Sequence, residues 1–174
     1  AANYKAPYSI RSKIPQKILI VGSGTGNDTA YAIEKGVSQI DAVEIDPAII
    51  HIGEKYHPQK PYQSNKVNVI QNDARNFIQH TKNKYDLIVY GLLDSHSSLS
   101  GKGGIRLDSY VYTVESFKEA RKTLTDDGYL SLSFNLSEES LGLKIFAMLT
   151  KAFDGKEPLV ISHYKQDTDK FKMQ

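Results

Sequence analysis

The feature that most constrains the fold is a glycine-rich loop directly after a short apolar run. Residues 17–21 read Lys-Ile-Leu-Ile-Val, which is typical of a strand buried on both faces of a parallel sheet. Gly22, Gly24 and Gly26 follow at once, and residues 28–35 then show the apolar spacing of a helix that ends at another glycine. This order predicts a layered α/β fold in which the backbone approaches a ligand closely at the helix N-terminus.

Strand and helix patterns alternate along the rest of the chain. Further strands are predicted at residues 39–46, 66–71, 85–90, 129–134 and 159–163, a turn at 127–128, and further helices at 47–56, from 73 onward, at 114–124 and at 141–153. Such alternation requires a mostly parallel sheet with right-handed crossovers. We therefore expect a single α/β domain over residues 1–174. It should have a Rossmann-like, doubly wound sheet of about six or seven strands, helices on both faces and a short lead-in at residues 1–16.

Composition limits the partners. The chain has 22 Lys and Arg against 20 Asp and Glu, a formal net charge of +2, which is too small to imply a nucleic-acid partner. It has no cysteine, and its histidines show no metal-ligand spacing, so we expect no metal. No apolar run approaches the roughly 20 residues of a membrane span, which predicts a cytoplasmic domain. Because the first residue is alanine rather than methionine, a longer parent chain is also expected.

Two acidic positions extend the predicted ligand site. A dinucleotide fingerprint would place its third glycine where Asn27 stands, so the loop disfavours NAD. Glu44 ends the next strand about 20 residues further on, where a carboxylate accepts hydrogen bonds from ribose hydroxyls. Asp73 follows the third strand and can accept from an adenine amine, although it would also serve as a helix N-cap. Together these positions predict an adenosine site, with turn glycines and strand-end acids without a ligand as the alternative.

These motifs, in this order, resemble the spermidine synthase family. The resemblance is carried by residues 18–26, 43–46, 72–77, 85–89, 115–117 and 127–128. It implies the Rossmann-like fold of class I methyltransferases and a transferase that uses S-adenosylmethionine or its decarboxylated form, without a metal. It also implies a cofactor site made of Gly22, Ser23, Gly24, Thr25, Gly26, Asp28, Glu44, Ile45, Asp73, Ala74 and Tyr90.

The nearest likeness, at residues 91–96 and 106–113, is to spermidine-synthase-like domains of bacterial membrane proteins. It implies that a membrane portion tethers the domain in the full protein. The polar stretch at residues 91–109 is too long for an ordinary connection, so we predict that it is an active-site loop or lid.

Two departures from the family affect the predicted reaction. Spermidine synthases carry an acid in the glycine loop where this chain has Thr25, which favours ordinary S-adenosylmethionine with its carboxylate. They also carry an acid that helps to deprotonate the attacking amine where this chain has Gly91, and its loss should slow aminopropyl transfer by about 10² to 10⁴. The main prediction is therefore methyl transfer to an unknown acceptor. Aminopropyl transfer and a regulatory domain that binds a nucleoside without turnover are the alternatives.

The acceptor site is predicted from the long loop. Asp94 and His96 are the candidate catalytic residues, which would orient or deprotonate the acceptor. Asp94, Tyr110 and Tyr112 are the candidate acceptor-binding residues. Surface exposure of the histidine and aromatic packing of the tyrosines are the alternatives. We expect a small-molecule acceptor, with an amine as one candidate, and a homodimer is one assembly open to the chain.

Overall fold

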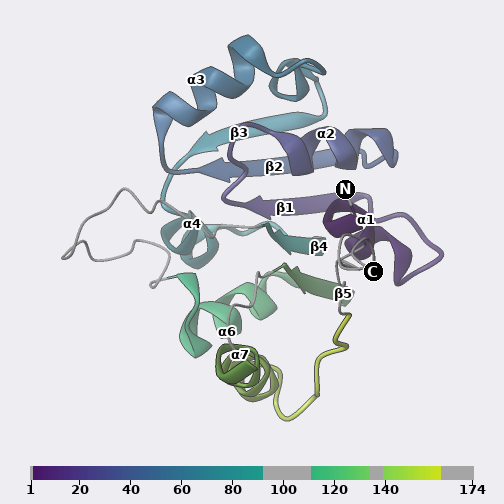
Figure 1. Ribbon diagram of the computed structural model, residues 1–174, viewed down its shortest axis with the longest axis vertical. Helices are drawn as coiled ribbons and strands as arrows, with labels where there is room; N and C mark the ends of the chain where they lie inside the picture. The colour runs from purple at the N-terminus through teal and green to yellow at the C-terminus, as the bar shows by residue number, and fades with distance from the viewer. Residues whose placement is uncertain (1, 92–110, 134–138, 162–174) are drawn as a thin grey trace, which may run out of the picture.

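A five-stranded parallel sheet organises the computed structural model, which describes residues 2–91, 111–133 and 139–161 (Figure 1). The strands are β1 Lys17–Val21, β2 Gln39–Glu44, β3 Val67–Gln71, β4 Tyr85–Tyr90 and β5 Leu124–Leu132, in the spatial order β3-β2-β1-β4-β5. All neighbouring strands are parallel. The predicted doubly wound, Rossmann-like fold is confirmed, with five strands in the described part rather than six or seven.

Helices connect the strands. They are α1 Ala2–Ser9, α2 Asn27–Glu34, α3 Pro47–Tyr56, the 3₁₀ helix η1 Pro61–Gln63, α4 Ala74–His80, α6 Val114–Lys122 and α7 Glu139–Ala152. Asp46 caps α3 by accepting from the Ala48 amide at 2.8 Å, and Asp73 caps α4 by accepting from the Asn76 amide at 2.8 Å. These bonds satisfy backbone donors that a helix leaves free at its first turn, as predicted for Asp73.

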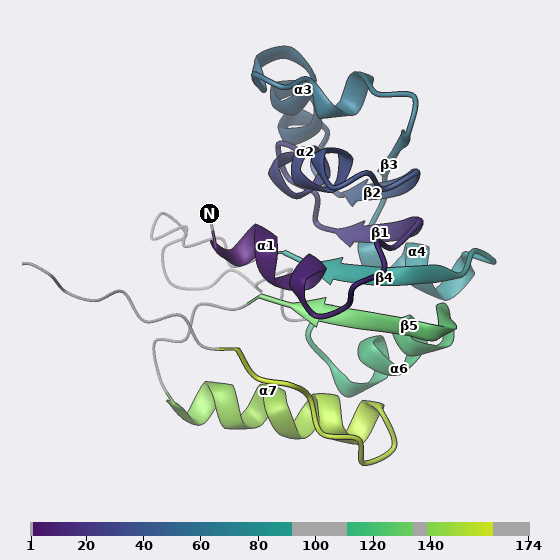
Figure 2. The same ribbon diagram turned by 90° about the vertical axis from the view of Figure 1, so that its right-hand side faces the viewer.

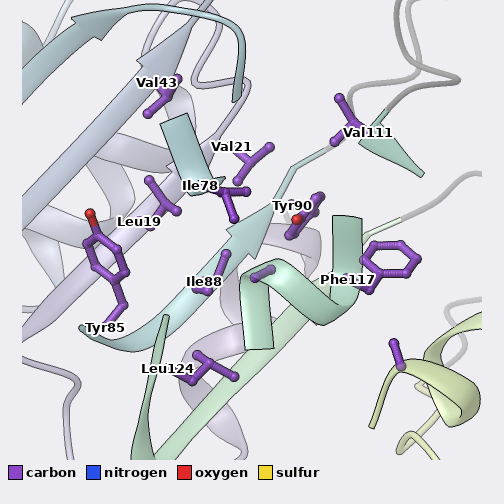
Figure 3. Packing of buried hydrophobic residues seen from close by; sticks show 12 residues of the cluster. Leu19, Val21, Val43, Ile78, Tyr85, Ile88, Tyr90, Val111, Phe117 and Leu124 are labelled. Atoms are coloured by element: carbon purple, nitrogen blue, oxygen red, sulfur yellow. The ribbon is translucent and has the colours of Figure 1, made fainter. Parts of the chain in front are cut away.

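Helices cover both faces of the sheet, because the central strands are apolar on both sides. On one face, Leu19, Ile88, Tyr90 and Phe117 join a core that is completed by α4, α6 and α7 (Figure 3). On the other face, Ile18, Ile20, Leu87 and Val89 pack with residues of α2, α3 and η1. All four apolar residues of β1 are fully buried, which confirms the interpretation of that strand.

The lead-in at residues 1–16 contains a helix that the sequence did not predict. In α1, the Tyr8 ring lies 5.6 Å from the Tyr31 ring of α2, and the Pro7 carbonyl accepts a 2.8 Å hydrogen bond from the Tyr129 hydroxyl of β5. Figure 2 shows α1 beside β4 and β5, away from α6 and α7. The N-terminal residues therefore belong to the folded domain.

Two predictions near the C-terminus are wrong in part. The expected turn at residues 127–128 lies within β5, where the register with β4 shifts between Tyr85 and Leu87. A Cβ at Gly128 would lie 2.7 Å from the Tyr85 carbonyl oxygen, so glycine is needed for close strand approach rather than for a turn. Residues 159–161 are not a strand, and the rest of the predicted last strand lies outside the described residues.

The strand order reverses at the centre of the sheet. From β1 the chain first moves outward to β2 and β3, and then returns to β4 on the other side of β1. In open α/β sheets, ligands bind beyond the carboxyl ends of the strands at such a reversal. The residues that follow β1 and β4 there are the glycine loop and Gly91.

Candidate nucleoside site

The glycine loop between β1 and α2 has a backbone that few other residues could adopt. Gly22, Gly24 and Gly26 have φ values of 66°, 57° and 100°, in the region that favours glycine. At Gly26, a Cβ would also lie 2.7 Å from the Pro61 side chain. The loop turns back onto β2, since the Ser23 amide donates to the Val43 carbonyl at 2.9 Å. The predicted ligand loop is therefore a tight turn held against its neighbours.

Tyr62 of η1 holds this loop in place through hydrogen bonds. Its hydroxyl donates to the Gly24 carbonyl at 2.6 Å and lies 2.8 Å from Ser23 Oγ, so the serine hydroxyl is the donor in that second bond. Burial raises the pKa of Tyr62 to about 12, which keeps its proton in place. From α3, Gly53 allows close contact, because a Cβ there would lie 2.7 Å from the Thr25 carbonyl oxygen. Sequence reasoning missed both residues, although Pro61 beside Tyr62 marked an ordered turn.

Glu44, at the end of β2, is bonded to the same loop. Its carboxylate accepts from the Gly24 amide at 2.9 Å, from its own neighbour Ile45 at 2.9 Å and from Asp46 at 3.0 Å. Only 8% of the residue is exposed. A carboxylate has about four acceptor positions, so one remains before any existing bond must change. Ribose binding at Glu44 stays a prediction, and the structure adds a role in fixing the loop.

The ends of β2 and β3 lie side by side. Glu44 is paired with Gln71, and the Asn72 amide donates to the Glu44 carbonyl at 3.1 Å. This brings Asp73 and Ala74, at the start of α4, to the strand ends where the predicted base would lie. The Ile45 side chain is 45% exposed there and offers an apolar surface. Their contact with a base remains a prediction.

A cavity of about 220 Å³ opens above the glycine loop, lined by Tyr4, Gly22, Ser23, Gly24, Thr25, Asn27 and Asp28. Pockets for whole small molecules are typically about 300–1,000 Å³, so this cavity has room for part of a sulfonium nucleoside. The predicted site residues that do not line it are Gly26, Glu44, Ile45, Asp73, Ala74 and Tyr90. Tyr4 and Asn27 line it without having been predicted.

Asn27 is held in place by a buried histidine. His57 Nε2 lies 3.1 Å from Asn27 Oδ1, and the Gln59 amide donates to His57 Nδ1 at 3.2 Å. Because Nδ1 accepts, Nε2 carries the proton and donates to Asn27. His57 is 8% exposed, and it positions a residue that lines the cavity.

Asp28 is the charged side chain of the cavity. It lies in the first turn of α2, and burial raises the pKa of its carboxyl to about 6. A Cβ at Gly91 would lie 2.9 Å from Asp28 Oδ2. The carboxylate from α2 therefore lies beside the residue that follows β4, and it lines the same cavity as the glycine loop that follows β1.

The remaining predicted residues lie elsewhere. The Tyr90 side chain is fully buried in the core, 5.6 Å from the Phe117 ring and 6.5 Å from that of Tyr112. Only the Tyr90 backbone could therefore face a cofactor. Tyr112 packs against Tyr90, and its role in binding the acceptor stays a prediction. Asp94, His96 and Tyr110 lie outside the described residues. Within the described ranges, no cluster of three or more metal-binding side chains is found.

Comparison with protein families identifies a relationship over most of the chain. A model of the spermine/spermidine synthase domain matches residues 8–151. A polyamine aminopropyltransferase of Korarchaeum cryptofilum is 27% identical over 119 residues, which are 67% of this chain and 34% of the relative. One from Buchnera aphidicola is 32% identical over 124 residues, 69% of this chain and 43% of the relative. The chain thus spans less than half the length of these curated relatives.

Solved structures share the fold. A spermidine synthase in complex with the transition-state analogue AdoDATO aligns with a TM-score of 0.66 and 18% identity, over 86% of this chain and 49% of that one. A SAM-dependent methyltransferase from Agrobacterium tumefaciens aligns with a TM-score of 0.61 and 16% identity, over 86% of this chain and 47% of its own. The class I methyltransferase fold is therefore confirmed.

The predicted membrane tether gains no support from these findings. No helix in the described part of the chain is both long and apolar enough to cross a bilayer, and the names of the relatives above refer to aminopropyltransferases.

Proposed function

The chain belongs to the spermine/spermidine synthase family, and on this premise we propose that it is a transferase domain that moves an aminopropyl group from decarboxylated S-adenosylmethionine to an amine. The family match carries the proposal, because residues 8–151 include the glycine loop, Asp28, Glu44 and Asp73. Curated relatives with this activity in their names add support. Aminopropyl transfer thereby replaces methyl transfer as the favoured reaction.

The proposed reaction is a displacement at carbon. The amine nitrogen forms a bond to the aminopropyl carbon, the carbon–sulfur bond breaks, its electron pair stays on sulfur as methylthioadenosine, and the amine releases a proton. A sulfonium is already a good leaving group, so positioning supplies much of the rate. In this chain, the glycine loop and Glu44 would hold the ribose, while Ile45 and Asp73 would hold the base.

The residues that line the cavity fit such a donor. The cavity combines backbone at Gly22 and Gly24 with one partly buried carboxylate, Asp28. A carboxylate at that place attracts a cationic group and repels an anionic one. Decarboxylated S-adenosylmethionine differs from the ordinary cofactor by lacking a carboxylate, so Asp28 favours the decarboxylated donor.

The test is turnover by the protein that contains this chain. The purified protein is incubated with decarboxylated S-adenosylmethionine and putrescine, and methylthioadenosine and the lengthened amine are measured by chromatography. We expect equal amounts of both products. Failure to form methylthioadenosine with putrescine or a panel of other amines would overturn the proposal. If the donor still binds, the result would instead support a regulatory domain without turnover.

Methyl transfer remains the second candidate because of Thr25. This residue lines the cavity, and its hydroxyl would tolerate the carboxylate of ordinary S-adenosylmethionine. Calorimetry with the two donors separates the candidates. Aminopropyl transfer predicts tighter binding of the decarboxylated form, whereas tighter binding of ordinary S-adenosylmethionine, with formation of S-adenosylhomocysteine, would favour methyl transfer.

A further inference from the structure

We infer that the Asp28 carboxylate binds a primary alkylammonium group of the ligand. The carboxylate belongs to α2 and lies where a side chain at position 91 would otherwise lie. This inference rests on the proposed function and identifies a specificity-determining residue for it. The ammonium could belong to the aminopropyl chain of the donor or to the amine acceptor. Both present the same chemistry to Asp28, so the experiment below separates the two sources.

The first argument is geometric. Asp28 lies in a helix that follows β1, whereas Gly91 follows β4, and the two strands are neighbours in the sheet. A Cβ on Gly91 would approach Asp28 Oδ2 to 2.9 Å. The absence of a side chain at Gly91 therefore leaves room for the carboxylate, and a larger residue there would displace it.

The second argument is electrostatic. The groups that face Asp28 are tyrosines: its charge acts on Tyr4 and Tyr8 of α1 and on Tyr62 of η1, and raises the pKa of each together with burial. These hydroxyls are neutral near pH 7. Within the part of the chain that the structure describes, no lysine, arginine or histidine forms an ion pair with Asp28. Asp28 is partly buried, and burial penalises its charged form, so a cation bound beside it would offset part of that penalty.

The third argument concerns the shape of the ligand group. The cavity is small, about 220 Å³, and is lined by Tyr4 next to the carboxylate. An alkylammonium group fits both the carboxylate and the tyrosine, because it donates up to three hydrogen bonds and its positive charge is attracted to an aromatic ring. A bulkier cation would find less room there.

A simpler role for Asp28 must be distinguished. An acid in the first turn of a helix is stabilised by the helix dipole without any ligand. If that were its whole role, Asp28→Asn would lower stability slightly and change the binding of charged and uncharged ligands equally. The experiment therefore compares ligands that differ only in the ammonium chain.

The experiment uses the protein that contains this chain, as wild type and as Asp28→Asn, with Glu34→Gln as the control. Glu34 is an exposed acid on the same helix, so the control removes the same charge away from the cavity. Calorimetry measures binding of decarboxylated S-adenosylmethionine and of methylthioadenosine, which has the same nucleoside without the aminopropyl chain. Steady-state kinetics measures KM for putrescine.

If Asp28 binds the ammonium of the donor, Asp28→Asn should weaken the binding of decarboxylated S-adenosylmethionine by about 10- to 100-fold, the usual range for a hydrogen bond to a charged group. The binding of methylthioadenosine should not change. If the ammonium group belongs to the acceptor, the KM for putrescine should rise by a similar factor while the binding of the donor stays unchanged. Equal effects on all three ligands, or none, would overturn the inference. The binding measurements need no turnover, so they stand even if the aminopropyl-transfer proposal fails.

Binding below neutral pH supplies a second readout. Because burial raises the pKa of Asp28 to about 6, protonation should weaken wild-type binding of the ammonium ligand by up to about tenfold for each pH unit below 6. Asp28→Asn should lose this dependence and Glu34→Gln should keep it. An unchanged pH profile in Asp28→Asn would contradict the assignment.

Discussion

Replacing Glu44 should first destabilise the fold, before any question of ligand binding arises. The carboxylate accepts from the amides of Gly24, Ile45 and Asp46 at 2.9–3.0 Å. It therefore joins the glycine loop to the end of β2. Glu44→Ala removes the shared acceptor, whereas Glu44→Gln keeps one oxygen, which can still serve Ile45 and Asp46, but turns an amide group toward the Gly24 donor.

The expected magnitude follows from which donors water can reach. A buried donor left without a partner costs about 1–3 kcal/mol. Ile45 and Asp46 are exposed residues, whereas Gly24 is partly covered, so water can replace the carboxylate at the first two amides more easily than at the third. We expect Glu44→Ala to lower the free energy of unfolding by about 2 kcal/mol and Glu44→Gln by about half of that.

Thermal denaturation of the ligand-free protein checks this order. For a domain of this size, a change of about 2 kcal/mol corresponds to a Tm shift of about 4–8 °C. Glu34→Gln is again the control, since an exposed acid should change stability by less than about 0.5 kcal/mol. If Glu44→Ala and the control have the same Tm, the carboxylate does not hold the loop, and the reasoning from these bonds is wrong.

Three further predictions concern the glycine loop and the opposite end of β1 and β4. Tyr62→Phe should lower the free energy of unfolding by about 1–3 kcal/mol, measured in urea, because it removes both hydroxyl bonds to the loop; an unchanged midpoint would contradict this. Gly26→Ala should cost more than Gly24→Ala in the same assay, since only the former meets a neighbour at 2.7 Å; the reverse order would refute the packing argument. Burial raises the pKa of Asp86, but the backbone amides that donate to its carboxylate lower the pKa by more, so the net shift is downward. The ionised carboxylate therefore stabilises the fold above about pH 4, and this stabilisation is lost as the pH falls further. Asp86→Asn should therefore show a weaker loss of stability in acid than the wild type, and an equal acid response would count against this role.

Local signals predicted much of the fold. The run at residues 17–21 is fully apolar except at its first position, and it forms the central strand because a strand covered on both faces needs no polar side. Asp73 caps α4, as its position after the third predicted strand indicated. These features depend on neighbours along the chain, so a sequence pattern can express them.

Features that depend on distant contacts were missed or misjudged. The helix α1 has weak helical signals, with Pro7 inside it, and is held by contacts to Tyr31 and Tyr129. Tyr90 follows the pattern of a site residue at a strand end, but its side chain points into the core. Which face a side chain takes at the last position of a strand depends on the register of the whole sheet.

Asp28 shows what the order of residues along a chain conceals. Spermidine synthases carry an acid where this chain has Gly91, at the end of β4. The missing acid was therefore an argument against aminopropyl transfer. In the folded chain, Asp28 in the first turn of α2 places a carboxylate oxygen 2.9 Å from where a Cβ of residue 91 would be. The charge at a binding site depends on all side chains that lie there in the folded protein, and not only on the residue at one sequence position. If Asp28 binds the ammonium group as inferred above, the site keeps an amine-binding carboxylate although position 91 is glycine, because the carboxylate comes from α2 instead of the end of β4.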